Sequence, residues 1–297
     1  MQEIMLLILT LVAIAMFWQH RRYHYIRHDL AQDMQRPLHS TDAFHVMVFF
    51  KLKPGDRVVE TARRFALQLQ SFSQARLIYA GQAAFTVNAL HLDNREWDGV
   101  LLFEFPSRDD YEQSRVDARA VLARRLFADS YLHGMRRNRS ASLLVPQWLL
   151  RRRMKDLLLG RWRIEPLQNS LAFETAPEFQ PWRNRVSRLR ALHEVNRDGL
   201  VMFNLIKYGA AGHQDFAEIY GDKLLSRMAV FRHGPLHMGR SVALEEFARF
   251  DRVYIAYYPS ARYFADLIAS QYFHHIAGSK LMGDSFRVAT APITARL

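Results

Sequence analysis

The sequence predicts an α+β protein made of two tandem βαββαβ units, whose sheets pack face to face as one barrel within a single chain. Short patterns recur in the same order roughly 155 positions later, which indicates a duplicated unit. Within each copy, apolar runs of strand length alternate with stretches of helical spacing. An uncharged apolar run near the N-terminus adds a separate prediction, one transmembrane helix.

Residues 1–20 are interpreted as a membrane anchor. Residues 4–18 carry no charge, and a helix over residues 1–18 would extend about 27 Å, close to the hydrocarbon thickness of a bilayer. Arg21 and Arg22 follow at once, so the positive-inside rule predicts a single-pass inner-membrane protein with a cytoplasmic soluble part. A cleaved signal peptide is the alternative, but no Lys or Arg precedes the apolar run.

The repeat is clearest in WDGVLLFEFPS and FDRVYIAYYPS, at residues 97–107 and 250–260. Both have an aromatic residue, then Asp, a hydrophobic run and aromatic-Pro-Ser. Pro cannot continue a strand and Ser is a good helix N-cap, so each copy predicts a strand followed by a helix. Three further pairs follow the same order: 45–53 with 200–208, 80–81 with 238–239, and 128–131 with 283–286.

Each unit predicts the same elements in the same order. In the first unit we expect strands at 46–52, 77–87, about 99–105 and from 129, with helices at 58–72 and 108–127. In the second unit we expect strands at 200–206, 236–244, about 252–258 and from 284, with helices at 213–228 and 261–281. This is the ferredoxin-like order, which leaves one sheet face open. The other unit's sheet is expected to cover that face.

The domain organisation follows from these elements. We expect a transmembrane anchor (1–20), a basic juxtamembrane linker (21–42), a degenerate first unit (43–137), a basic amphipathic connector (138–197) and a second unit (198–297).

The composition narrows the classes of partner. The 297 residues are 49% hydrophobic, which excludes general disorder, and the lack of cysteine excludes disulfides and thiolate metal sites. The formal net charge of +12 would suit nucleic acid or an anionic membrane. Because the arginines cluster beside apolar runs, we favour a lipid bilayer with an anionic surface and expect no nucleic-acid partner.

The connector contains PQWLLRRRMKDLLLGRWRIEP at residues 146–166. Its mixture of Trp, Leu and Arg is typical of a helix lying in a membrane interface; a helix packed on the outside of the barrel is the alternative. The part after Pro166 is interpreted as a linker. The residues predicted to meet the membrane surface are Arg21, Arg22, Trp148, Arg151, Arg152, Arg153 and Trp162.

The second unit, VMFNLIKY…IYG…MGR…FDRVYIAYYPSARYF…GDSFRVAT, resembles the DUF1330 family of the dimeric α/β-barrel superfamily. The resemblance covers about a hundred residues from Leu200 onward, and the first unit resembles the family more faintly. It implies the fold and a pocket between the sheets. The superfamily includes cofactor-independent monooxygenases, muconolactone isomerases and haem-handling enzymes, whereas DUF1330 implies no settled activity.

In such a barrel, polar residues on apolar strands are the candidates for binding a ligand. Asn204 interrupts VMFNLI, and either bonds the backbone or orients a ligand. Arg240 either binds a carboxylate or points to solvent. Tyr254 and Tyr258 should share one face of their strand and Tyr257 the other, although the sequence leaves open which face meets the interior.

Two histidines complete the candidates. His237 lies near the glycine-containing strand, and His275 lies on the second helix of the second unit, where a neutral imidazole could act as a base. Catalytic residues are not identified. Because the sequence contains no HExxH, P-loop, GxSxG or metal-ligand array, we predict no metal and no cofactor, with haem as an alternative suggested by relatives in the superfamily.

Two functions are compatible with these patterns. The first is a membrane-anchored barrel that binds, and in one form transforms, a small apolar or aromatic molecule between its sheets without a dedicated metal. The second is a non-enzymatic subunit or adaptor of a membrane-associated complex, with a barrel filled by its own side chains. Phe49, Phe50, Phe103 and Phe105 of the first unit favour the second.

Overall fold

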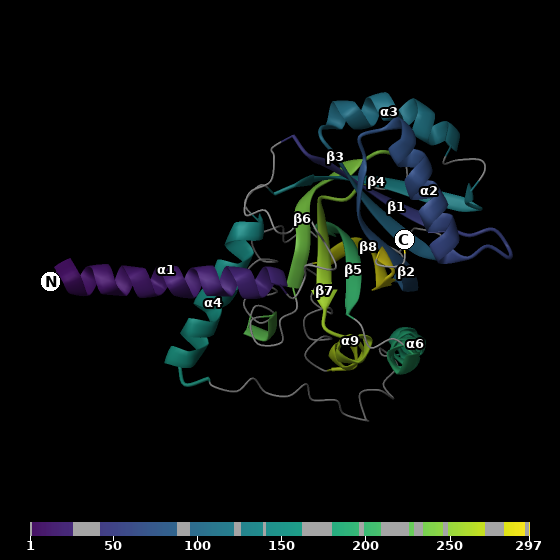
Figure 1. Ribbon diagram of the computed structural model, residues 1–297. Coiled ribbons are helices and arrows are strands. Elements are labelled where there is room, and N and C mark those ends of the chain that lie inside the picture. The colour runs from purple at the N-terminus through teal and green to yellow at the C-terminus, as the bar shows by residue number, and fades with distance from the viewer. Residues whose placement is uncertain are drawn as a thin grey trace.

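The computed structural model describes residues 2–25, 42–87, 96–121, 126–138, 141–161, 180–195, 199–208, 226–228, 234–245, 249–270, 282–294 and 297. Eight antiparallel strands form one closed barrel, drawn in Figure 1. They are β1 (Phe44–Lys51), β2 (Arg76–Val87), β3 (Gly99–Phe105), β4 (Asp129–Arg137), β5 (Leu200–Tyr208), β6 (Gly234–Ala243), β7 (Arg252–Tyr258) and β8 (Met282–Pro292).

The strand order shows two equivalent halves. Around the barrel the order is β1-β3-β2-β8-β5-β7-β6-β4. The first half is therefore β4-β1-β3-β2 and the second is β8-β5-β7-β6, the ferredoxin-like order in each case. Two seams, β2 with β8 and β4 with β6, join the halves. The predicted α+β chain with two sheets closed into one barrel is confirmed.

Helices cover the outside of both halves. In the first half, α2 (Val58–Phe72) and α3 (Arg108–Val121) lie over the sheet, and Phe65 of α2 packs on Phe103 of β3. In the second half, α9 (Ala261–Ile268) and α6 (Gln180–Val195) lie together over the sheet, as Figure 1 shows. Most of the helix predicted at 213–228 and the end of the one predicted at 261–281 lie outside the described residues.

Helix α6 corrects the interpretation of the stretch after Pro166 as a linker. Val186 and Leu189 are fully buried against the second sheet, with Leu192 beside them. Their spacing of three residues is the apolar stripe of an amphipathic helix. Four arginines and a tryptophan between residues 180 and 195 make that stripe inconspicuous in the sequence.

The repeated residues perform the same structural tasks in both halves. Asp98 accepts the backbone N–H of Leu52 at 2.7 Å, and Asp251 accepts that of Tyr208 at 2.8 Å. Ser107 caps α3 by accepting the N–H of Asp110, and Ser260 caps α9 by accepting that of Tyr263. The duplicated Asp and Pro-Ser are therefore scaffold: they terminate strands and begin helices.

Outside the barrel, α1 (Gln2–Tyr25) projects from the molecule, and α4 (Ala141–Leu158) packs against it (Figure 1). Gln147 of α4 donates to the backbone carbonyl of Met16 at 3.4 Å. Within the described part of the chain, no helix has the length and apolar character that crossing a bilayer requires. The transmembrane anchor at residues 1–20 stays a prediction.

Candidate functional site

The centre of the barrel is filled by aromatic side chains from both halves. Phe49 of β1 contacts four other rings: it stacks on Tyr131, meets Phe203 and Phe286 edge-on, and lies tilted against Trp97. All of these side chains are buried. The interior is therefore a packed core at this level, and chemistry has to occur where polar side chains replace the rings.

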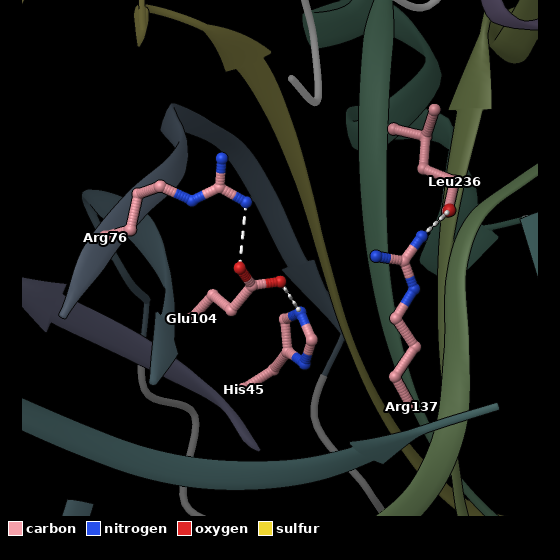
Figure 2. A network of polar contacts seen from close by, with 5 residues as sticks. All are labelled: His45, Arg76, Glu104, Arg137 and Leu236. Atoms are coloured by element: carbon pink, nitrogen blue, oxygen red, sulfur yellow. Dashed lines mark hydrogen bonds and ion pairs between the residues drawn. The ribbon is translucent and has the colours of Figure 1, made fainter. Parts of the chain in front are cut away.

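Polar side chains gather at one end of the barrel, around His45 at the start of β1. Register pairs His45 with Glu104 of β3, and the Glu104 carboxylate lies 3.2 Å from His45 Nε2. The other carboxylate oxygen accepts from Arg76 Nη2 at 2.8 Å. Figure 2 shows this chain, which runs from the half-exposed Arg76 inward to the fully buried imidazole.

A second histidine, from the other half of the barrel, lies close to His45. His237 of β6 is 1% exposed, and its ring centroid lies 5.9 Å from that of His45. Across the seam, Arg137 of β4 donates to the backbone carbonyl of Leu236, next to His237 (Figure 2). The polar cluster of Arg76, Glu104, His45, His237 and Arg137 thus combines residues that lie far apart in the chain.

The position of the Glu104 carboxylate distinguishes the two ring nitrogens of His45. Glu104 Oε2 lies beside His45 Nε2, so a proton on that nitrogen would face the carboxylate and leave Nδ1 as the accepting nitrogen. A carboxylate in this position also stabilises the imidazolium that forms when the ring takes up a proton. Arg76 in turn donates to the other carboxylate oxygen and so fixes the orientation of Glu104. The three side chains thus form a series of charged and polar contacts that runs from the surface to the buried ring.

A different buried network lies along β4. Tyr131 Oη is 2.7 Å from His133 Nδ1, and His133 Nε2 is 2.7 Å from Ser241 Oγ of β6. His133 is fully buried, and desolvation lowers its pKa from 6.5 to about 3. Burial, with a smaller contribution from the Glu245 charge, raises the pKa of Tyr131. Both groups are therefore neutral near pH 7 and form a hydrogen-bonded strut across the β4–β6 seam.

A third buried contact joins the other seam. Thr290 of β8 donates to the carbonyl of Val201 at 2.9 Å. Because a threonine hydroxyl has one proton, Tyr79 of β2 is the donor in the 2.7 Å Tyr79–Thr290 bond. Burial raises the pKa of Tyr79, which keeps it protonated. Both hydroxyl groups therefore donate a hydrogen bond within the protein, and we interpret their contact as structural.

The structure places the predicted site residues on different faces. His237 and Tyr257 lie inside the barrel, where both are buried. Asn204, Tyr254 and Tyr258 lie outside, because the interior positions of β5 and β7 are Phe203, Leu205, Val253, Ile255 and Tyr257. Asn204 bonds the backbone carbonyls of Met202 and Tyr254, so the structural alternative holds for it.

Arg240 likewise departs from the ligand interpretation. It is exposed and pairs in register with Arg252, on the outer side of β6, so the alternative of pointing to solvent holds. His275, the residue for which haem was the alternative, lies outside the described residues. Of the candidates in the second half, His237 joins the polar cluster and Tyr257 belongs to the aromatic core.

The sequence interpretation missed the first half's contribution, namely His45, Glu104, Tyr131 and His133. The sequence indicates a degenerate first unit, because it resembles the family more faintly and has Phe49 where the second unit has Asn204. A signal was present: His45, Glu104 and His133 are polar residues in otherwise apolar runs, the same criterion that selected Asn204. Applied to both units with strand alternation, it would have found them.

Among the residues that the structure describes, no three His, Asp or Glu side chains gather in an arrangement that could hold a metal ion.

Comparisons with known proteins find a likeness to solved structures alone. No protein-family model matches the chain, so the DUF1330 resemblance is not shown, and no curated protein matches it. Solved structures do match. A variant of the chlorite dismutase from Candidatus Nitrospira defluvii is 10% identical over 88% of this chain and 95% of its own, with a TM-score of 0.44.

Two other solved structures show the same likeness. A protein provisionally assigned as a monooxygenase from Fusobacterium nucleatum is 9% identical over 86% of this chain and 94% of its own, with a TM-score of 0.43. A protein provisionally assigned as a DyP-type peroxidase from Shewanella oneidensis is 10% identical over 86% and 94%, with a TM-score of 0.38. At these identities and TM-scores, the three likenesses carry no argument about the family or the reaction of this chain.

Proposed function

We propose that this chain is a membrane-tethered α/β-barrel protein that binds a small acidic molecule, aromatic or apolar in its body, at the polar end of its barrel and exchanges a proton with it. The observation that carries the proposal is the meeting of His45 and His237, one from each half, with ring centroids 5.9 Å apart. A purely structural core would fill both positions with apolar side chains at lower cost.

The charges around the two histidines favour an acidic ligand. Arg76 and Arg137 bring two cations to this end of the barrel, and Glu104 supplies one anion. With neutral histidines the cluster is therefore net positive. An arginine guanidinium pairs well with a carboxylate or enolate, and the aromatic rings around Phe49 begin just inside the cluster.

The same residues define a proton route. An acidic C–H or O–H bond of the ligand would give its proton to an imidazole lone pair, and Glu104 would stabilise the resulting charge on His45. The proton leaves to solvent along the Arg76 side, where the network reaches the surface. The reaction class is thus proton abstraction or isomerisation, which consumes no oxidant.

Helix α1 is the proposed membrane tether. Residues 4–9 are each more than half exposed, although all six are large and apolar. Successive helical residues are rotated by about 100°, so this exposure covers the whole circumference of the helix. A protein partner would cover one side of α1, whereas lipid chains surround a helix. We therefore propose that α1 inserts into the inner membrane, with the barrel on its cytoplasmic side.

A filled, non-enzymatic barrel is the second candidate. The packing of four rings around Phe49 favours it, because the protein's own side chains fill the centre of the barrel. The two candidates differ at the polar end alone. If the barrel is only a scaffold or adaptor, replacing His237 changes stability and nothing that the protein binds.

Untargeted mass spectrometry of small molecules released from the purified, detergent-solubilised chain decides between them. We expect an acidic molecule to co-purify with the wild type and with Arg240→Ala, a control on the outer face. The His237→Phe variant should lose it while keeping the native circular dichroism spectrum. Equal recovery from all three proteins, or recovery from none above a blank, would contradict the ligand-binding function.

A further inference from the structure

The surface that remains unexplained is the outer face of α4. Its exposed positions are Met154 and a series of five, Leu144, Trp148, Arg151, Lys155 and Leu158. The residues of this series follow one another at alternating steps of four and three, so they form a single stripe along the helix. Trp148 is 47% exposed and Leu158 is 83% exposed, unusually high values for large apolar side chains.

The opposite face of α4 already has its partners. Val145 and Leu149 are buried, and Asp156 pairs with Arg152, Nε to Oδ1, at 3.3 Å. Arg152 also donates to Ser226 at 2.6 Å. This corrects the assignment of Arg152 to the membrane surface, since it turns inward, and Arg153 is half-buried. Trp162 and the side chains of Arg21 and Arg22 lie outside the described residues.

The exposed stripe carries cations and apolar groups but no acid. Asp156 is the one acidic residue of α4, and it is 2% exposed. Arg151 and Lys155 stand between Trp148 and Leu158 on the stripe, followed by the exposed Arg161 just beyond the helix. Positive charges interleaved with Trp and Leu match a surface that is anionic outside and apolar just beneath.

We propose that the Leu144–Leu158 stripe of α4 is a binding site for anionic phospholipid headgroups, with Trp148 and Leu158 inserted among the upper acyl chains. The position of α4 supports this occupant, because it packs on α1 beside Met16, at the end of α1 nearest the barrel. The inference rests on the proposed tether, since an inserted α1 would hold the stripe at the level of the headgroups. It is independent of the ligand at His45 and His237.

Spin labels on single cysteines test the site, because the natural chain contains none. The full chain would be reconstituted into vesicles of phosphatidylcholine, with or without phosphatidylglycerol. Labels would replace Leu158 on the stripe, Leu9 on α1 and Leu67 on α2. Leu67 is the matched control, 62% exposed on a helix that covers the other side of the barrel.

The Leu158→Cys label should gain oxygen accessibility, the mark of an acyl-chain environment, in vesicles that contain phosphatidylglycerol. Adding Arg151→Glu and Lys155→Glu should abolish that gain, and the Leu67→Cys label should stay aqueous throughout. A Leu158→Cys label that stays aqueous in both vesicles would overturn the proposal. So would label–label broadening independent of lipid composition, which would assign the stripe to a second copy of the chain.

The Leu9→Cys label separates this failure from failure of the tether. If α1 is inserted and the α4 site is wrong, the Leu9 label is in the lipid while the Leu158 label is in water. If the tether itself is wrong, the Leu9 label is in water in both kinds of vesicle.

Discussion

At the scale of single residues, the two buried histidine environments have opposite characters. His133 is enclosed by neutral partners, Tyr131 and Ser241, so burial alone sets its properties and keeps it uncharged. His45 faces a carboxylate, and that carboxylate faces an arginine which reaches solvent. The same residue type thus has neutral partners in one network and a carboxylate partner in the other.

The lowered pKa of His133 predicts acid destabilisation. A folded-state pKa of about 3, below the unfolded value of 6.5, means that the unfolded chain binds a proton more readily. The contribution of His133 is therefore intact above pH 6.5 and declines as the pH falls toward 3. Between pH 6.5 and 5 the wild type should lose roughly 2 kcal/mol through this group.

Urea unfolding of the wild type and of His133→Gln over that range measures the effect. The variant starts from a lower stability because it loses hydrogen bonds, so the slope with pH is the readout. Its slope should be shallower than that of the wild type. Parallel slopes would show that His133 is not the buried neutral group described here.

At the scale of elements, the duplication allows the same kind of helix cap to be tested in both halves. Ser107 and Ser260 cap α3 and α9 at equivalent positions of the repeat. Ser260→Ala should lower the free energy of unfolding by about 1 kcal/mol. Ser107→Ala should cost somewhat more, because Ser107 also donates to the Asp110 carboxylate.

Chemical denaturation of both variants and of the double variant checks these values. The two caps belong to different halves, so their effects should add to within about 0.5 kcal/mol. Ser71→Ala, an exposed position near the end of α2, is the control and should change stability little. A double variant no less stable than either single one would show that the halves do not share one cooperative unfolding.

Element positions were the part of the structure that the sequence predicts best. Helix α2 has the predicted bounds, 58–72, and the strand that follows begins within one residue of its predicted start. The apolar periodicity of the sequence predicts these bounds, because each element has a wide stripe of buried residues. Helix α6 was missed because its stripe is narrow, and its arginines give the segment the composition of a linker.

At the scale of the whole molecule, the barrel depends on two glycines at equivalent places in the repeat. Gly81 lies at the β2–β8 seam and Gly239 at the β4–β6 seam, where they pair with Pro292 and Arg137. A Cβ on Gly239 would come within 2.1 Å of the Arg136 carbonyl oxygen. A Cβ on Gly81 would meet the Tyr79 hydroxyl at 2.6 Å. Each seam closes because these positions lack a side chain.

Gly239→Ala should therefore be the more damaging of the two substitutions. Its clash is with backbone, which cannot move without opening the seam, so we expect a loss of about 3 kcal/mol or more. Gly81→Ala should cost less, because its clashes are with side-chain atoms of Tyr79 and Thr290 and not with backbone. Arg240→Ala is the neighbouring control and should change little. Urea midpoints measure all three, and a Gly239→Ala midpoint equal to that of the control would refute the role of the glycine.

The site could be predicted only in part, because it exists at the scale of the whole barrel. Sequence identifies His237 as a candidate, and alternation separates Tyr257 from Tyr254 and Tyr258. It does not reveal that the second half meets β4 and β1 of the first at the polar end. That pairing depends on which strands form the seams, and strands of similar apolar composition do not encode it individually.

The most direct test of the central claim is an NMR titration of the full chain, labelled with ¹³C-histidine, with benzoate as a representative aromatic carboxylate. If the polar end binds acidic ligands between the two halves, the imidazole signals of His45 and His237 move together while that of His133 stays fixed. His193 on α6 serves as the reference for non-specific binding. If the His45 and His237 signals stay in place up to the benzoate concentration at which His193 begins to move, the account is contradicted.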